Sequence, residues 1–482
     1  MDLHTDGKIL IGGASYDVTT TTNMAVLRLK SNGTVDSSFA LNGIFQLDLV
    51  PGYNESITQI KFKTDSSGSI DLGSYYDGST NVYHNFLLSL NNDGTPNITF
   101  GNNGIVLLKM FTTAYGQKAE ALALGRDDKI YVAGDVTPNP NTTDPDIGVV
   151  ALSSDSVVDT SFGTTGLVSI EKIYGQDPTA MEVVFDGKIL VGGDSYTGSI
   201  GRTDLMLFRL TEHGVVDSTF GTNGIVIMNV GNHNDRLRDF CVDEENGNII
   251  ICGTYQPSAD PTNYDNYIAR LLPNGEADPA FATGGKFKFT YNSNEEMRAI
   301  AIQADHRPVS VGFKTNATQN IDMVVVRLTE DGAFDLSWNG TGTVVTNIGL
   351  QEYPNEIAIQ PDGKVLVAGS YVESFNNFVA NTFALRYDTD LPTEVPDIFL
   401  HSDHGLRIFP NPASSFAWMQ IEDQGILPEK LDVYDISGKW LQSFDLTSTR
   451  QLLDLQELAS GTYLIRGATS DKIFITKLLV NN

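Results

Sequence analysis

An arginine and an aspartate recur together along the first 390 residues. Four times an aspartate stands eight residues after an arginine: Arg28–Asp36, Arg209–Asp217, Arg270–Asp278 and Arg327–Asp335. A ring of arginines could bind anionic ligands, because guanidinium groups pair with carboxylates and phosphates through parallel hydrogen bonds. A three-residue loop with a closing glycine would instead place each aspartate opposite its arginine across a hairpin. We favour this second interpretation, in which each pair holds its own repeat together.

The two cysteines, Cys241 and Cys252, flank the segment VDEENGNIII. If Asn246 and Gly247 form a two-residue turn, the cysteines lie directly opposite each other at a hydrogen-bonded pair, where a disulfide fits less comfortably. A disulfide formed after export and two small buried side chains are the alternatives. No cysteine and histidine spacing is typical of zinc, so the sequence predicts no metal site.

Three octets, DGKILIGG at 6–13, DGKILVGG at 186–193 and DGKVLVAG at 362–369, mark a repeat. Alignment on them gives seven copies, each with a glycine five residues beyond the lysine position: Gly13, Gly73, Gly134, Gly193, Gly253, Gly312 and Gly369. Apolar runs flank an Asp-Gly or Asn-Gly dipeptide in many copies. We expect a hairpin with a type I′ turn, followed by a glycine where the backbone bends or approaches a neighbour closely.

A third apolar run follows each hairpin, then a phrase such as DSTFGTNG at 217–224, then a fourth run. Four strands in about sixty residues make one propeller blade, and four to eight blades close a ring. A parallel β-helix would use shorter coils, and independent sandwiches of this size would bury too little core. The sequence therefore predicts an all-β, seven-bladed propeller over residues 1–390, whose last copy lacks its fourth strand.

These units resemble the delta-60 repeat family of bacterial proteins. The matching features are the DGK hairpin, the LRL run and the D-x-S-F-G-x-x-G phrase, and they cover roughly residues 1–390. The resemblance implies a repeat fold and carries no assigned chemistry.

The composition excludes some classes of partner. A net charge of −29 argues against binding to nucleic acid and to anionic lipid, since both need lysine and arginine. Acidic turns that keep a β protein soluble explain this charge more simply than a dedicated acidic binding face. No apolar run reaches the ~18–20 residues of a membrane-spanning helix, so we expect no transmembrane segment.

The repeat stops after Tyr387, and we expect a linker at 391–405 and a small immunoglobulin-like β-sandwich over 406–482. This last stretch closely resembles the type IX secretion system C-terminal sorting domain of Bacteroidetes. The matching motif residues are Pro410, Asn411, Pro412, Asp435, Gly438, Gly461, Tyr463 and Lys477. The resemblance implies that the secretion machinery is a partner and that the protein is released or attached to the cell surface. An ordinary accessory sandwich is the alternative.

Two functions remain open. The first is a binding or scaffolding propeller with an extracellular ligand, either glycan or protein, and with no catalytic residue, cofactor or metal. The second is a glycan-active hydrolase or lyase with its site at one mouth of the ring, built from repeat-breaking loops at 135–148, 254–267 and 371–382. The sialidase box S-x-D-x-G-x-x-W is only echoed at 329–338, because Trp338 lies seven residues beyond Asp331 and not five.

The start of the chain suggests a missing segment. Met1 falls inside the first strand of copy one, and no leader with a basic and an apolar region precedes it. The first three strands occur seven times, but the fixed phrase with its fourth strand occurs six times. We expect an N-terminal truncation that removed a signal peptide and one copy of the phrase. One blade should then have three strands and an exposed edge near Met1 or Tyr387.

Overall fold

The structure is a computed structural model that describes two compact units, residues 1–310 with 329–333 and residues 311–328 with 334–482. The described residues are 1–16, 21–79, 82–108, 118–136, 146–170, 176–197, 202–231, 233–258, 263–291, 294–316, 320–374, 379–388, 397–398, 406–409, 411, 413–421, 427–435, 440–468 and 473–480. They form strands, turns and one short 3₁₀ helix, η2 (Arg126–Asp128). The predicted all-β class is confirmed.

The first unit contains five antiparallel sheets of four strands, and in each sheet every strand pairs with the next in the chain. The sheets are β1 (Asp2–Leu3), β2 (Ile9–Tyr16), β3 (Thr22–Leu29) and β4 (Ile44–Leu47); β5 (Glu55–Phe62), β6 (Gly68–Asp77), β7 (Val82–Asn91) and β8 (Ile105–Leu107); β9 (Ala119–Leu124), β10 (Ile130–Val136), β11 (Asp146–Leu152) and β12 (Leu167–Ile170); β13 (Gln176–Val183), β14 (Ile189–Thr197), β15 (Arg202–Leu210) and β16 (Ile225–Met228); and β17 (Asp235–Val242), β18 (Ile249–Tyr255), β19 (Asp265–Leu271) and β20 (Lys286–Phe289).

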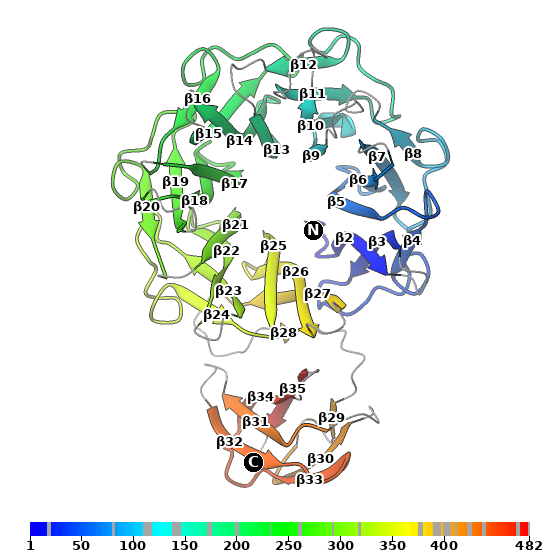
Figure 1. Cartoon of the computed structure of the whole chain (residues 1–482), viewed down its shortest axis with the longest axis vertical. Helices are drawn as coiled ribbons and strands as arrows, with labels where there is room; N and C mark the ends of the chain where they lie inside the picture. Colours follow the sequence, from blue (N-terminus) through cyan, green and yellow to red (C-terminus); the bar gives the residue numbers. More distant parts are fainter. Residues whose placement is uncertain are drawn as a thin grey trace. The chain divides into compact units, whose positions relative to one another are not determined.

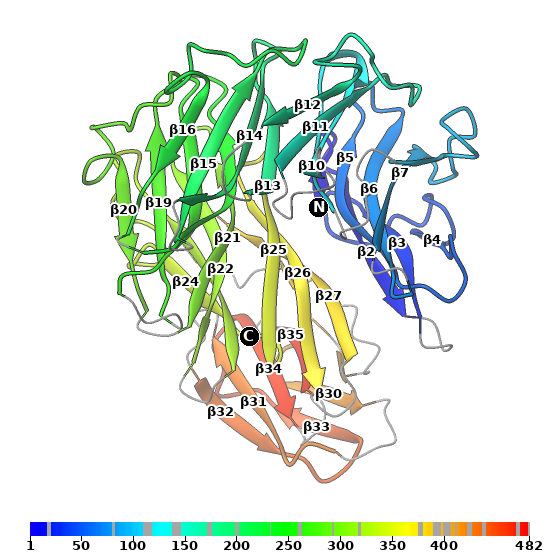
Figure 2. The same cartoon turned by 45° about the horizontal axis from the view of Figure 1, so that its top comes forward.

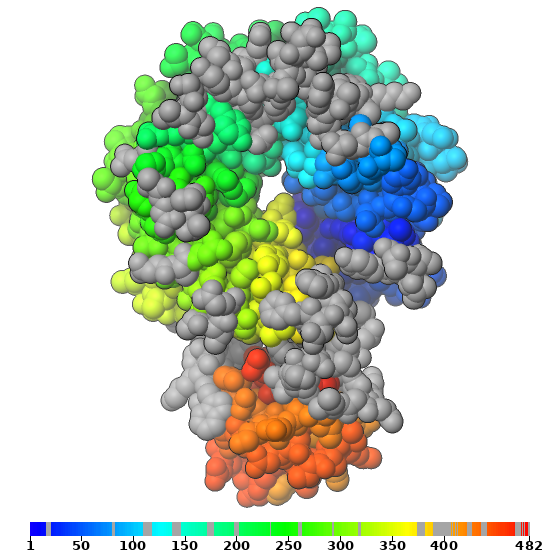
Figure 3. Space-filling view, in the orientation of Figure 1, coloured from blue at the N-terminus to red at the C-terminus, as the bar shows by residue number. Residues whose placement is uncertain are grey.

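These five sheets follow one another along an arc, with the first strand of each sheet at the inner edge and the fourth at the outer edge (Figure 1). A second view shows their strands standing side by side (Figure 2). In the space-filling view the sheets touch in chain order, from blue to green (Figure 3). The inner strands β5, β9, β13 and β17 therefore share one concave edge.

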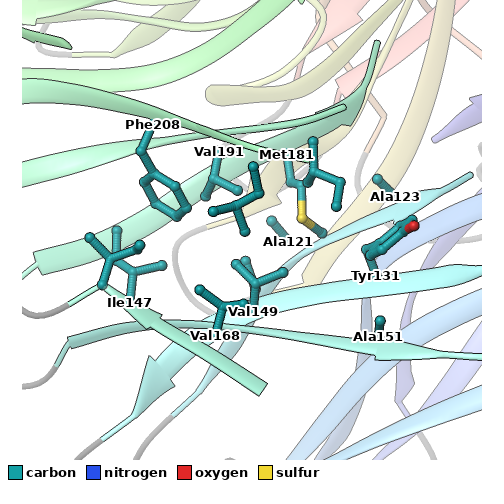
Figure 4. Packing of buried hydrophobic residues seen from close by; sticks show 14 of the residues in the cluster. Ala121, Ala123, Tyr131, Ile147, Val149, Ala151, Val168, Met181, Val191 and Phe208 are labelled. Carbon is teal, nitrogen blue, oxygen red and sulfur yellow. The ribbon is translucent and has the colours of Figure 1, made fainter. Parts of the chain in front are cut away.

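Apolar side chains fill the space between neighbouring sheets. Between the third and fourth sheets, Val149, Val191 and Phe208 belong to one buried cluster (Figure 4). Both faces of the second, third and fourth sheets are covered in this way, which explains continuous apolar runs in place of strict alternation. Full burial of one such side chain contributes about 1.5–3 kcal/mol.

The hairpin turns differ from the predicted type I′ form. The amide of His4 donates to Lys8 O at 2.8 Å, so the turn before β2 spans three residues. Gly7 has φ of +84°, whereas Asp6 is not among the residues with positive φ. A three-residue loop needs one left-handed residue at its end, and glycine takes this conformation without strain. The prediction of a hairpin is right and that of its turn type is wrong.

The repeated glycine, which lies within the second strand, stands where the sheet leaves no room for a side chain. A Cβ at Gly73 would lie 2.4 Å from the Phe86 ring and 2.7 Å from Ser56 O. At Gly253 it would lie 2.0 Å from Arg236 O. The predicted close approach is therefore present at these positions. At Gly13 nothing lies within 4 Å of the added atom, because β1 is only two residues long.

The remaining strands belong to the last two repeats. They are β21 (Glu295–Ile302) in the first unit, β22 (Pro308–Thr315), which runs from the first unit into the second, and β23 (Ile321–Arg327), β24 (Thr343–Thr346), β25 (Gln351–Ile359), β26 (Val365–Ser374), β27 (Val379–Tyr387) and β28 (Asp397–Ile398) in the second. The last repeat has three long strands, and the two-residue β28 pairs with β27. The expected linker thus supplies a short fourth strand, which satisfies part of an edge that would otherwise be unpaired.

The C-terminal residues of the second unit form two sheets. One contains β29 (Leu406–Phe409), β30 (Phe416–Ile421) and β33 (Arg450–Asp454); the other contains β31 (Lys430–Asp435), β32 (Trp440–Asp445), β34 (Gly461–Ala468) and β35 (Ile473–Val480). Met419 from the first sheet and Val433 and Ile465 from the second lie in one fully buried core. The predicted sandwich of two sheets is present, and its immunoglobulin-like topology stays a prediction.

Candidate functional site

The four repeated arginines contact the predicted aspartates. The distance from arginine Nε to aspartate Oδ2 is 2.9 Å for Arg28–Asp36, 2.8 Å for Arg209–Asp217, 2.7 Å for Arg270–Asp278 and 2.8 Å for Arg327–Asp335. Burial opposes ionisation of Asp217, but hydrogen bonds from Thr219 and Arg209 outweigh it and lower the pKa to about 2. Asp217 is therefore a charged structural group at neutral pH.

The same arginines also contact the following repeat. Nη1 of Arg209 donates to Pro273 O at 2.7 Å, and Nη1 of Arg270 donates to Glu330 O at the next turn. The amide of Gly221 donates to Asn274 O at 2.7 Å in parallel. The guanidiniums of Arg28, Arg209 and Arg270 thus each join their own aspartate to the turn of the next repeat. Because these donors already have protein acceptors, the interpretation of the arginines as a ligand-binding ring loses its basis.

The aromatic residue of the fixed phrase completes this contact. The guanidinium of Arg209 lies 4.6 Å from the centre of the Phe220 ring. Gly275, in the next turn, has φ of +88°, and a Cβ there would lie 2.9 Å from that ring. The turn glycine is therefore required both by its backbone conformation and by the ring beneath it. The fixed phrase is an inter-repeat clamp, so a ligand site must lie at positions that do not repeat.

The cysteines are not directly opposite each other, and the prediction of their register is wrong. Cys241 pairs with Ile250, and Cys252 pairs with Asp239. The loop between Val242 and Ile249 has six residues, where we expected a two-residue turn. Diagonal neighbours on one sheet face are about 7–8 Å apart, which is beyond comfortable disulfide geometry. Both thiols are free, and burial raises their pKa values.

The first strands of five repeats carry a one-residue bulge at the same aligned position, and the residue inserted there varies between repeats. In β5, β9, β13, β17 and β25 the pairing with the second strand shifts by one residue directly after the residue opposite the repeated glycine. The residues inserted by these bulges are Thr58, Glu120, Thr179, Arg238 and Asn355. A bulge bends its strand and redirects a side chain, and bulges are frequent beside functional sites.

Three of these bulge residues meet in a pocket of about 380 Å³ at the inner edge of the first unit. Its lining comprises Thr58, Gln59, Glu120, Asp135, Pro178 and Thr179. The volume lies within the range of small-molecule sites, but hydroxyl, amide and carboxylate groups replace the usual apolar walls. We call this cavity the inner-edge pocket. Asp135 is the first residue of a loop predicted as a site for catalysis, and much of the rest of that loop lies outside the described residues.

One of the two carboxylates of the inner-edge pocket, that of Glu120, has a cationic neighbour. Nζ of Lys118 lies 3.1 Å from Oε2 of Glu120. The hydroxyl of Thr58 donates to Leu72 O at 3.2 Å, and that of Thr179 donates to Gly192 O at 3.4 Å. These two bonds satisfy carbonyls at equivalent places beside the bulges and leave oxygen lone pairs to accept from a ligand. The pocket can therefore bind hydroxyl or amine groups through several oriented acceptors.

Sequence reasoning missed this site because no pocket residue belongs to a repeated motif. The signal in the sequence is variation and not repetition. Thr58, Glu120 and Thr179 stand at one aligned position and differ in chemistry, whereas their neighbours repeat. No group of three histidine, cysteine or acidic residues suited to a metal ion occurs among the residues that the structure describes. No described helix is long and apolar enough to cross a membrane.

Comparison with protein families identifies both parts of the chain. Residues 4–39, 186–220, 244–281 and 360–390 match the domain of unknown function (DUF5122) beta-propeller. Residues 407–481 match the secretion system C-terminal sorting domain. This chain joins beta-propeller repeats to a secretion sorting domain. The sorting domain indicates export to the cell surface or beyond, as predicted. No curated protein matches the sequence.

The chain also has distant similarity to solved structures. A protein of unknown function from Dyadobacter fermentans is 12% identical over 70% of this chain and 98% of its own, with a TM-score of 0.41. The propeller domain of the trilobed protease from Pyrococcus furiosus is 12% identical over 82% and 95%, with a TM-score of 0.38. Prolyl oligopeptidase B from Galerina marginata is 10% identical over 96% of this chain and 55% of its own, with a TM-score of 0.45.

The described motif residues of the sorting domain hold its sandwich together. Oδ1 of Asn411 accepts a hydrogen bond from Leu479 N at 2.8 Å, and the Tyr463 hydroxyl donates to Ala459 O at 2.7 Å. Gly461 begins β34, Asp435 ends β31, and Lys477 stands opposite Leu464 in β35. Pro410, Pro412 and Gly438 lie outside the described residues. The placed contacts lie within the sandwich and stabilise it.

Proposed function

We propose that this secreted or cell-surface propeller is a binding protein whose inner-edge pocket takes a hydroxyl-rich extracellular ligand, a glycan, without catalysis. Seven repeat copies, six of them complete, support closure of the blades into one seven-bladed ring. The sorting domain would deliver this ring to the outside of the cell and would take no part in ligand binding.

The convergence of three bulge residues on one polar pocket carries this proposal. Thr58, Glu120 and Thr179 come from three consecutive inner strands, and each is redirected by the same one-residue insertion. Gln59 adds an amide that both donates and accepts. Sugars present adjacent hydroxyl groups, each a donor and an acceptor, and this lining offers partners of both kinds. A purely structural bulge would not need to gather such groups in a cavity.

A glycan array probed with the full-length chain tests the proposal. We expect binding to a restricted set of oligosaccharides, which the E120Q and T179V variants weaken at least tenfold. D305N, which changes an exposed aspartate whose side chain is 53% accessible, serves as the control and should bind normally. Array binding that survives all pocket substitutions would place the ligand elsewhere.

A glycan-active hydrolase remains the second candidate, because Glu120 and Asp135 are two carboxylates lining one pocket. Glycosidases use such a pair as acid and as nucleophile or base. Lys118 argues against this role for Glu120, since its ammonium lies 3.1 Å from that carboxylate and competes with a substrate for it. Release of reducing sugar from an array ligand, abolished in both E120Q and D135N, would establish the enzyme and contradict the binding proposal.

A further inference from the structure

We infer that the ligand surface continues from the inner-edge pocket to Arg238 on β17, and that Arg238 there binds the acidic group of a carboxylate- or sulfate-bearing glycan. This inference rests on the proposed function and adds the class of glycan. It makes the charged bulge residues Glu120 and Arg238 the residues that determine specificity.

The strand register makes Arg238 the next bulge residue after Thr58, Glu120 and Thr179. The bulge residue of β13 is Thr179, which lines the pocket, and β17 is the following inner strand. In β17 the pairing shifts between Leu237 and Asp239, so Arg238 is the inserted residue. The inner strands β13 and β17 lie in contact. The same local geometry that directs Thr179 into the pocket therefore directs Arg238 toward the neighbouring stretch of the inner edge.

The four bulge residues of the first unit fall into two chemical kinds. Thr58 and Thr179 use their hydroxyls on main-chain carbonyls, so they have a structural role whatever else they bind. Glu120 and Arg238 make no such bond in the described structure and cannot be explained by the needs of the bulge. Glu120 pairs with Lys118 and Arg238 with Glu296, and both side chains remain partly exposed, so the two charged positions offer a ligand a feature that the threonines do not.

Arg238 stands in a locally cationic group. Its Nη2 lies 3.2 Å from Oε2 of Glu296, and Nε of Arg298 lies 3.1 Å from Oε1 of the same carboxylate. Two guanidiniums therefore share the Glu296 carboxylate, in a protein of net charge −29. Side chains of Arg238 and Arg298 are 27% and 30% exposed. The group is therefore within reach of a ligand and is held in place by Glu296.

The guanidinium of Arg238 retains unused hydrogen-bonding capacity. Its Nη2 bonds Glu296 and its Nε is buried without an acceptor among the described residues, so the outer Nη1 and Nη2 groups are those that a ligand can reach. A guanidinium carries five donors in a fork that matches a carboxylate or sulfate group. An acidic sugar placed with its hydroxyl groups in the inner-edge pocket would bring its anionic group to this fork. A neutral sugar would gain the pocket contacts only.

Matched probes separate the two parts of the surface. Trigalacturonate and its neutral methyl ester have the same hydroxyl groups and differ in charge, and a sulfated galactan oligosaccharide carries the alternative anion. Calorimetric titration of the full-length chain should show at least tenfold tighter binding of one acidic glycan than of the ester. R238Q should remove this difference without changing the affinity for the ester. R202Q, at an exposed strand end, removes the same charge and should change neither affinity.

The outcomes distinguish this inference from the function on which it rests. If R238Q leaves the preference for acidic glycan intact, or if acidic and neutral probes bind alike, the role of Arg238 is wrong while glycan binding stands. If a hexaglutamate peptide binds and none of the glycans does, both the glycan class and the proposed function are wrong. Near-ultraviolet circular dichroism of R238Q that matches the parent chain shows that lost preference is not lost folding.

Discussion

Nζ of Lys129 lies 2.6 Å from Oδ2 of Asp159, and it lies 5.8 Å from the centre of the Phe162 ring. In four other repeats an arginine on the third strand occupies this place beside the aspartate and the aromatic ring. In the third repeat that arginine position is Ala151, and the cation comes from the start of the second strand instead. The third repeat therefore keeps the cation but takes it from another place in the chain, whereas the second repeat has Ser89 and Asn97 at the two positions and carries neither charge.

A double-mutant cycle measures this substitute pair. K129M and D159N should each destabilise the chain, and their effects should be non-additive by about 1–2 kcal/mol because the two groups act as one unit. The hydrogen bond from Lys129 lowers the pKa of Asp159 to about 2, so the coupling should be present at pH 7 and should fade as the pH falls through that value. Urea unfolding at pH 7 provides the four free energies, and strict additivity would show that the contact is incidental.

The buried arginine–aspartate pairs should be costly to break. Arg28 and Asp36 are each 4% exposed, so D36A leaves a buried guanidinium without its counter-charge. We expect a loss of about 3–5 kcal/mol in unfolding free energy. D305A removes an exposed aspartate, 53% accessible, and should cost less than about 0.5 kcal/mol. Equal effects of the two substitutions in urea unfolding would contradict the clamp.

Asp71 should make stability depend on pH. It is fully buried where five other repeats have isoleucine or valine, and neither of its carboxyl oxygens has a hydrogen-bond partner among the described residues. Burial raises its pKa from 3.8 to about 8. The folded chain therefore keeps a proton that the unfolded chain loses, and stability falls as the pH rises between those values.

Replacing Asp71 tests that sign. D71V should stabilise the chain by about 1–3 kcal/mol, and the gain should be larger at pH 8 than at pH 5. D71N is the matched control, since it keeps the shape and the polarity without the titration. Chemical unfolding of the three proteins at both pH values gives the answer; a gain from D71V that is the same at pH 5 and pH 8 would refute the buried carboxyl as its source.

The cysteines should remain thiols in the exported protein. Their diagonal register separates them by more than a disulfide spans without backbone movement. Protein secreted under oxidising conditions, then denatured and treated with a thiol reagent, should take up two labels per chain. An unlabelled product whose mass rises only after reduction would show a disulfide and an altered β17–β18 register.

Removal of residues 406–482 should stop export. The family match and the packed core of this sandwich indicate that the secretion machinery recognises it as a folded unit. Expressed in its native host, the shortened chain should collect in the periplasm, and a version with a disrupted core, V433D, should do the same. Immunoblots of the culture medium and periplasm distinguish the outcomes, and normal secretion of the shortened chain would refute a sorting role.

The features of the fold that the sequence predicted are the ones that recur along the chain. The octet, the arginine and the fixed phrase recur at constant spacing because each makes the same contact in several repeats, and the sorting motif recurs across a family. Glu120 and Arg238 could not be found in this way, because a bulge shifts the register by one residue without changing residue type in a regular manner. The cysteine register failed for a related reason, since a six-residue loop and a two-residue turn can share the same Asn-Gly dipeptide.

The central claim, that this propeller binds glycan at the inner-edge pocket without cleaving it, is tested most directly by hydrogen–deuterium exchange of the full-length chain with and without an array-positive oligosaccharide. The account predicts slower exchange in peptides that cover β5, β9 and β13, with the oligosaccharide recovered intact. Protection confined to other strands or loops, or recovery of shortened oligosaccharide, would contradict it.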